Sequence, residues 1–91
     1  MKIVFLPSAR EGLVWFRRYY ASVFPEGMQR AKASYMIMLK TLAAHPEAGR
    51  EVGTHSRIFP ITRTPFAVVY RVRSEQIEVL AVMDMRAGEE Q

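Results

Sequence analysis

The chain has 91 residues, which is enough for one small domain, and its 49% hydrophobic and 24% charged content is typical of folded proteins. Its net charge of +4 favours an acidic partner, either nucleic acid or an acidic protein segment. The absence of cysteine excludes disulfides and thiolate metal sites and favours a cytoplasmic location. We expect no membrane span and no signal peptide, because no apolar run approaches ~20 residues and no cleavage site follows the first strand.

The first half of the chain predicts a strand followed by two helices. β-formers fill residues 2–6, and the spacing of Ser8 and Glu11 matches a capping box that starts a helix. The sequence at 24–27 contains proline and glycine and ends this helix. A second helix is predicted over about 26–44, and Pro46 ends it.

The second half predicts three strands. Residues 45–55 form a loop, and a strand over 57–62 is shortened by Pro60. The runs 66–72 and 77–85 flank a polar turn at 73–76, which is a hairpin signal. The polar residues 87–91 are expected to be a flexible tail behind a single domain of residues 1–86.

The element order β-α-α-β-β-β predicts an α+β fold, with an N-terminal helical hairpin packed on one face of a small antiparallel-rich sheet. Strict alternation assigns apolar residues to both faces of the hairpin. One set is Phe66, Val68, Tyr70, Val72, Ile77, Val79, Ala81 and Met83, and the other is Ala67, Val69, Leu80 and Val82. Since the helices cover one face, we expect apolar surface to remain open as an interaction site.

The arginines are the main candidates for a functional site. Between residues 50 and 73, five arginines face one glutamate, so this segment carries the whole net positive charge. A solvated basic face is an equally good interpretation of this segment. The late pair Asp84 and Arg86 fits a local ion pair better than a catalytic acid. No metal, cofactor or nucleophile motif occurs, and His45 and His55 are expected at the surface.

Three segments of the chain resemble the RelE/ParE superfamily of bacterial toxin–antitoxin modules, and the resemblance extends from the first strand to Arg86. They are Leu42-Ala-Ala-His-Pro-Glu-Ala-Gly-Arg50 after the second helix, Arg57-Ile-Phe-Pro with Val69-Tyr70-Arg71-Val72, and the final strand 77–86. The resemblance implies a type II toxin that is neutralised by a cognate antitoxin. It also implies a homodimer or a toxin–antitoxin heterocomplex.

Within this superfamily the chain looks closer to the ParE-like (plasmid stabilisation) toxins than to the RelE-like mRNA endonucleases. When the chain is aligned with the RelE-like nucleases on Val69-Tyr70, their strand arginine falls on Ala67. Their arginine near the end of the last strand falls on Arg86. The RelE basic residues of the preceding strand fall near Ile58 and Pro60, and the C-terminal tyrosine would lie past Gln91. RNA cleavage needs a general base and a positive charge that stabilises the transition state. The remaining arginine supplies the charge, but the base is missing. ParE-like chains often carry histidine where this chain has Asp84.

The resemblance therefore implies a toxin that acts by binding its target, DNA gyrase, rather than by catalysis. The expected target and antitoxin contacts are Arg57, Arg63, Arg71, Arg73 and Arg86. Two alternatives stay open. One is a metal-independent endoribonuclease that acts on ribosome-bound mRNA through Arg57, Arg63, Arg71 and Arg86. The other is a degenerate family member that keeps the fold without toxicity.

Overall fold

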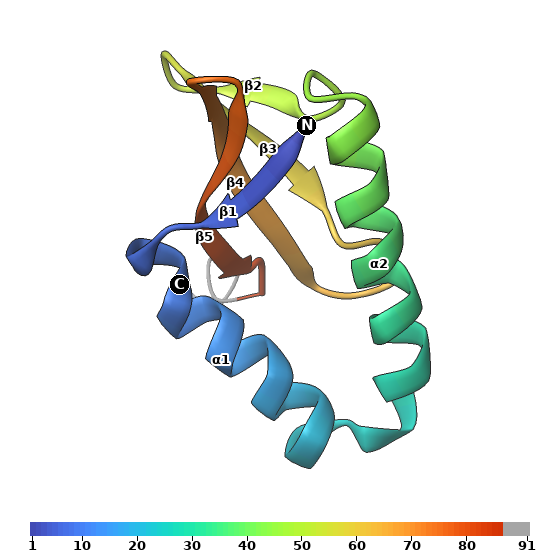
Figure 1. Cartoon of the computed structure of the whole chain (residues 1–91). Coiled ribbons are helices and arrows are strands. Elements are labelled where there is room, and N and C mark those ends of the chain that lie inside the picture. The colour runs from blue at the N-terminus through green and yellow to red at the C-terminus, as the bar shows by residue number, and fades with distance from the viewer. Residues whose placement is uncertain (87–91) are drawn as a thin grey trace.

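The computed structural model describes residues 1–86 as a five-stranded sheet with two helices on one face (Figure 1). The strands are β1 (Lys2–Phe5), β2 (Arg50–Val52), β3 (Ser56–Pro60), β4 (Phe66–Arg73) and β5 (Gln76–Asp84), and the helices are α1 (Arg10–Arg18) and α2 (Met28–Ala44). The tail predicted at 87–91 lies outside the described residues. Neither helix within residues 1–86 has the length and apolar character that a bilayer span requires.

The α+β class and the order of the predicted elements are confirmed, with one strand added. The sheet order is β1-β5-β4-β3-β2, in which β1 runs parallel to β5 and the other pairs are antiparallel. The prediction left β2 inside the 45–55 loop and was wrong there. This three-residue edge strand has only Val52 as an apolar residue, so its pairing with β3 gives no sequence signal.

The predicted capping box is also wrong. The Ser8 hydroxyl donates a hydrogen bond to the Leu80 carbonyl oxygen at 2.7 Å instead of capping the helix. The chain enters α1 through a 3₁₀ turn over Pro7–Ala9, where Pro7 occupies the first position and needs no amide partner. Ser8 therefore ties the entry of α1 to the middle of β5.

A β-bulge in β5 changes which side chains face the core. Tyr70 pairs with Val79 and Val69 pairs with Ala81, so Leu80 is an extra residue in β5. The bulge reverses the alternation that the sequence predicted for the rest of the strand, because side chains alternate with a period of two. Strict alternation placed Val82 on the other face of the sheet from Val79, but the bulge brings Val82 to the same face and buries it in the core.

The core lies between the sheet and the two helices, as predicted. The helices contribute buried Phe16, Ala31, Met38 and Leu42, and the π-helical turn Tyr19–Val23 after α1 contributes Tyr20. The sheet contributes Phe66, Val68, Tyr70, Ile77, Val79 and Val82. Edge-to-face aromatic contacts join the layers, with the Phe16 and Phe66 ring centroids 5.0 Å apart. On the opposite face of the sheet Val69 and Ala81 are partly exposed and Met83 is exposed, whereas Ala67 is buried.

Gly12 allows α1 to lie directly against the backbone of β5. A Cβ atom at this position would collide with the Val82 carbonyl oxygen, and Val82 Cβ would lie 3.2 Å away. The obstacle is the backbone of β5, which pairs with β4 at this position and cannot move aside as a flexible side chain can. The contact between α1 and β5 therefore requires glycine.

We expect Gly12→Ala to lower the free energy of unfolding by about 1–3 kcal/mol, the usual cost of overpacking. This result would oppose helix propensity, which favours alanine by about 1 kcal/mol. Urea denaturation followed by circular dichroism measures the change, and Glu11→Ala at the exposed neighbouring position is the control. A Gly12→Ala protein as stable as the wild type would contradict the close packing.

Candidate functional site

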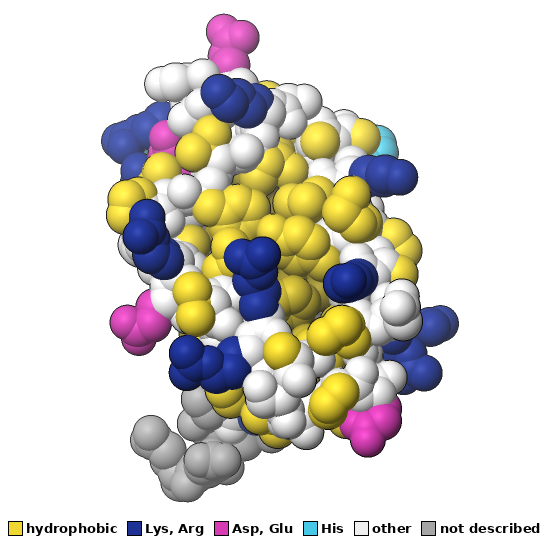
Figure 2. All heavy atoms as spheres, turned by 60° about the horizontal axis from the view of Figure 1, so that its bottom comes forward, with side chains coloured by type: hydrophobic (Ala, Val, Ile, Leu, Met, Phe, Trp, Pro, Cys, Tyr) yellow, Lys and Arg dark blue, Asp and Glu magenta, His cyan; other side chains and the backbone are white. Residues whose placement is uncertain are grey.

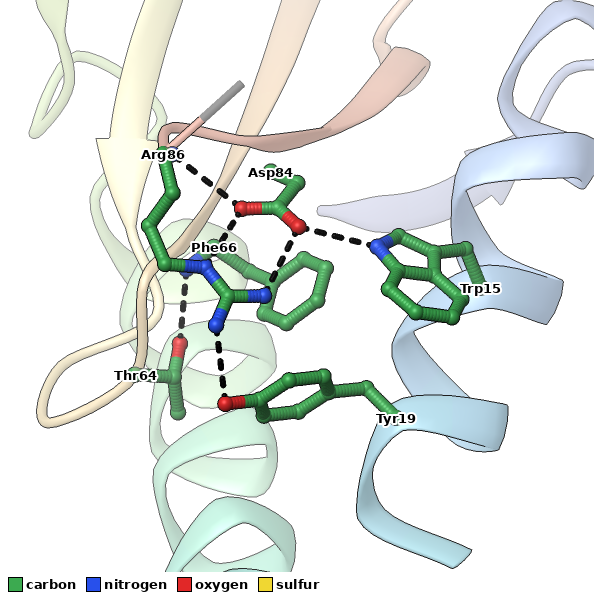
Figure 3. A network of polar contacts seen from close by, with 6 residues as sticks. All are labelled: Trp15, Tyr19, Thr64, Phe66, Asp84 and Arg86. Atoms are coloured by element: carbon green, nitrogen blue, oxygen red, sulfur yellow. Dashed lines mark hydrogen bonds and ion pairs between the residues drawn. The ribbon is translucent and has the colours of Figure 1, made fainter. Parts of the chain in front are cut away.

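A polar network joins the end of β5 to α1 (Figure 3). Arg86 donates to both carboxylate oxygens of Asp84, from Nε at 3.0 Å and from a terminal nitrogen at 2.9 Å. The Trp15 indole N–H donates to the same carboxylate at 2.9 Å, and Arg86 also donates to the Tyr19 hydroxyl at 2.8 Å. The guanidinium carbon lies 4.3 Å from the Tyr19 ring centroid, which adds a cation–π contact.

This network changes the ionisation of both charged groups. Hydrogen bonds from Arg86 and then from Trp15 hold the pKa of the Asp84 carboxyl well below its usual range, against the opposing effect of burial. The Asp84 carboxylate, chiefly through its hydrogen bonds, raises the pKa of Arg86. The pair is bidentate, and its carboxylate side chain is only 17% exposed. Asp84 is therefore a fixed acceptor for Arg86 and Trp15, with no free proton to donate near neutral pH.

Arg86 thus has a structural role, whatever else it contacts. The sequence indicated its ion pair with Asp84, since the two residues are close in the chain. It gave no signal for Trp15 or Tyr19, which lie 69 and 67 residues away from their partners. The bulge at Leu80 turns the Asp84 side chain toward α1, since Asp84 pairs with the buried Phe66.

At the opposite end of the sheet, two more of the predicted arginines have partners of their own. Arg57 donates to the Gly49 carbonyl oxygen at 2.7 Å and forms a longer ion pair of 3.4 Å with exposed Glu51. Arg71 donates to Glu78 at 2.8 Å. This hydrogen bond, followed by the one from Gln76, lowers the pKa of Glu78. Both arginines are partly neutralised, so they contribute less free charge than the sequence implied.

Around these arginines lies a basic surface, which we call the hairpin end. Arg57, Arg71 and His55 line a polar hollow of about 220 Å³, and Arg73 joins Arg71 and His55 around an adjoining hollow. Within residues 1–86, Arg73 forms no salt bridge and is exposed. The hairpin end therefore brings together three of the five predicted site residues.

The other two predicted residues, Arg63 and Arg86, belong to the far end of the sheet. Arg63 has a left-handed φ of 62° in the turn between β3 and β4, which Thr64 stabilises by accepting from the Phe66 amide. The Pro65 carbonyl oxygen accepts a hydrogen bond from the Met85 amide, so this turn borders the end of β5. The eight residues of β4 separate the two ends by roughly 23 Å at 3.3 Å per residue. The four arginines of the endoribonuclease alternative do not converge on one phosphate.

Comparison with known proteins identifies the family. Residues 3–87 match the model of the family described as "ParE toxin of type II toxin-antitoxin system, parDE". The chain belongs to the ParE toxin family. A solved structure titled "Chromosomal ParDE TA system from P. aeruginosa" shares the fold, with a TM-score of 0.69 and 24% identity. The match covers 92% of this chain and 95% of that one, and no curated protein matches the sequence.

The resemblance drawn from the three sequence segments is thereby confirmed at the level of the ParE family. Two of those segments have structural roles that the fold explains. The Tyr70 hydroxyl donates to the Pro46 carbonyl oxygen at 2.6 Å and accepts from the Gly49 amide at 2.9 Å. Together with Arg57, Tyr70 therefore anchors the link after α2 to the sheet.

The carboxylates of this ParE-family protein should make its stability fall at acid pH. Because the folded-state pKa values of Asp84 and Glu78 are depressed, the unfolded chain takes up protons that the folded chain does not. The ionised carboxylates stabilise the fold fully above the ordinary carboxyl pKa of ~4. This contribution is lost as the pH falls toward the lower pKa values that the two groups have in the folded chain. We expect Arg86→Gln to lose less free energy of unfolding than the wild type when the pH falls. The difference should be roughly 1–2 kcal/mol after allowance for solvent screening.

Urea denaturation of wild type and Arg86→Gln between pH 7 and pH 2.5 measures this difference. Arg18→Gln, at an exposed position on α1, is the control for the loss of one positive charge. Parallel curves for wild type and Arg86→Gln, offset by the same free energy at every pH, would show that Asp84 does not depend on Arg86.

Proposed function

We propose that this ParE-family chain is the toxin of a type II toxin–antitoxin module, with its toxin domain in residues 1–86. In this proposal it acts by binding DNA gyrase and is neutralised by a cognate antitoxin. The observation that carries the choice of binding over RNA cleavage is the separation of the predicted arginines between two ends of the sheet. Both proposed partners would place the chain in the cytoplasm.

The chemistry of the two ends also supports binding rather than cleavage. RNA cleavage requires a base and cations gathered around one phosphate. At the far end, Arg86 is held by Asp84 and Tyr19, and at the hairpin end Arg71 is held by Glu78. The endoribonuclease alternative would need these groups to leave their partners and meet across the sheet.

The exposed arginines are the better candidates for target contacts. Arg73 at the hairpin end and Arg63 in the β3–β4 turn are exposed, and neither forms a salt bridge within residues 1–86. Arg57, Arg71 and Arg86 already donate to protein oxygens and would contribute mainly by positioning their neighbours. We therefore assign the primary contacts with gyrase or its bound DNA to Arg73 and Arg63.

Expression of the chain alone should stop growth and induce the DNA-damage response, and coexpression of the antitoxin encoded beside it should restore growth. Purified protein should inhibit gyrase supercoiling and trap a cleaved gyrase–DNA complex. Primer extension on translated message should show no new cuts. Unchanged supercoiling, at concentrations that stop growth, would refute the gyrase target. Cuts in the mRNA that vanish in Arg86→Ala would support the endoribonuclease alternative. Growth without arrest would support the alternative of a degenerate, non-toxic family member.

Charge reversal distinguishes the two ends of the sheet. We expect Arg73→Glu to weaken gyrase inhibition about tenfold, because a rim charge that meets an acidic partner mainly changes the association rate and its salt dependence. Arg63→Glu makes the same charge change at the far end, roughly 23 Å away, and reports on that end separately. If both variants inhibit gyrase as the wild type does, neither end is the contact surface.

A further inference from the structure

The strand register brings basic side chains together on the open face of the sheet, which the helices leave uncovered. Residues that are paired directly in neighbouring strands point to the same face. Lys2 pairs with Gln76, and Gln76 pairs with Arg73, so Lys2 and Arg73 share one face. Arg71 precedes Arg73 by two residues on β4 and points the same way. This face is the open one, because Tyr70, between Val69 and Arg71, is buried in the core.

A fourth basic residue reaches the same face from the other edge of the sheet. Arg50 pairs with Ile58, and Ile58 pairs with Val69, which lies two residues before Arg71 on β4. The two edge strands thus contribute one cation each, and β4 between them contributes two. Four strand spacings of ~4.8 Å give the set a width of roughly 19 Å. We call these residues the basic band: Lys2, Arg50, Arg71 and Arg73.

Little negative charge opposes the basic band. Lys2, Arg50 and Arg73 are exposed, and none forms a salt bridge within residues 1–86. Among the strand residues described, Glu78 is the one carboxylate on this face, and it is held by Nε of Arg71. Four positive charges against one negative charge leave the band with a net charge of +3.

The floor between these cations is made of small aliphatic side chains. Val4, Val69 and Ala81 occupy open-face positions and are partly buried. Within the described strands, no open-face position carries an aromatic residue. Unstacked bases bind to aromatic rings, and the centres of protein interfaces are enriched in them. The band therefore suits a ligand that offers regularly spaced negative charge rather than bases or apolar side chains.

The helix side of the molecule is built differently. Figure 2 shows Lys and Arg side chains there around an apolar hollow. Phe16, Tyr20 and Tyr35 line this hollow, so aromatic rings lie beside the helices and not at the open-face strand positions. Basic charges on the helices therefore serve as a matched control for those of the basic band.

We propose that the basic band binds the sugar–phosphate backbone of duplex DNA, and this inference rests on the proposed function, whose target is gyrase with its DNA. A duplex carries one negative charge per ~1.7 Å of its axis, so a width of roughly 19 Å offers a phosphate to every cation. Glu78 holds Nε of Arg71, while the two terminal nitrogens donate to no oxygen within residues 1–86 and remain for a phosphate. Because phosphate contacts carry no sequence information, the binding is independent of sequence. In the gyrase complex the toxin thus contacts the DNA as well as the enzyme.

The salt dependence of DNA binding without gyrase tests the number of contacts. Fluorescence anisotropy of a short labelled duplex, titrated with the toxin, gives the affinity. Four phosphate contacts predict that the affinity falls roughly 100-fold between about 50 and about 200 mM salt. We expect the triple variant Lys2→Gln, Arg50→Gln, Arg73→Gln, with one contact left, to lose only about fourfold over this range and to bind more weakly at the lower salt concentration.

The control removes the same charges from the helix side. Arg18→Gln, Arg30→Gln and Lys32→Gln together neutralise two arginines and one lysine at exposed positions. This control should keep the wild-type affinity and salt dependence. Equal losses in both triple variants would mean general charge attraction and would overturn the basic band.

Methyl NMR of the wild-type protein gives a test that needs no substitution. Val4 and Val69 lie on the open face, whereas Val14 and Val23 are exposed on the helix side. We expect the duplex to shift the ¹³C-methyl signals of Val4 and Val69. Shifts confined to Val14 and Val23 would overturn the inference, as would tighter binding of single-stranded DNA or of duplex RNA than of duplex DNA.

Gyrase assays separate this inference from the function on which it rests. If the wild type neither inhibits supercoiling nor traps a cleaved complex, the proposed function fails, whatever the duplex titration shows. If the wild type inhibits gyrase and the band variant binds DNA and inhibits gyrase equally well, the inference alone fails. A band variant that binds duplex DNA as the wild type does but no longer inhibits gyrase would assign the band to the enzyme's protein surface and would overturn the DNA contact.

Discussion

The placement of α1 depends on a short stretch of backbone in β5, from Leu80 to Val82. The Leu80 carbonyl oxygen accepts the hydroxyl of Ser8 at the entry to the helix, and the Val82 carbonyl oxygen fills the space that a side chain at residue 12 would need. The bulge at Leu80 also turns Val82 and Asp84 toward the helices. This short stretch of β5 therefore sets the helix position, part of the core and the polar network at the strand end.

The positive charge of this protein is divided between structural and free arginines. Arg57, Arg71 and Arg86 each donate to oxygen atoms of the folded chain, and Asp84 fixes Arg86 especially firmly through two hydrogen bonds. Arg63 and Arg73 are exposed. Counting arginines along the sequence therefore overestimates the charge that a target meets, because paired guanidinium groups present a weaker field than free ones.

This division gives the ParE-family fold two kinds of surface with different chemistry. The ends of the sheet are polar and basic, which suits a target that includes DNA. Between α1 and α2 lies a hollow of about 300 Å³ that is lined mainly by apolar and aromatic side chains, among them Phe16, Tyr20 and Tyr35. Because the two surfaces are built from different elements, substitutions can change one without disturbing the other.

The sequence by itself determined the α+β class, the order of its main elements and the family. The class and the order follow from local signals, namely the helical spacing of apolar residues, the prolines at 46, 60 and 65, and the hairpin with its turn at Ser74 and Glu75. The family follows from the resemblance of three segments to the RelE/ParE toxins. The tertiary structure decided the parallel pairing of β1 with β5, the edge strand β2, the bulge at Leu80, and the contacts of Asp84 and Arg86 with α1. The hollow between α1 and α2 also arises only from the angle between these helices. Each of these features joins residues distant in the chain, and no periodicity within one element records such a contact.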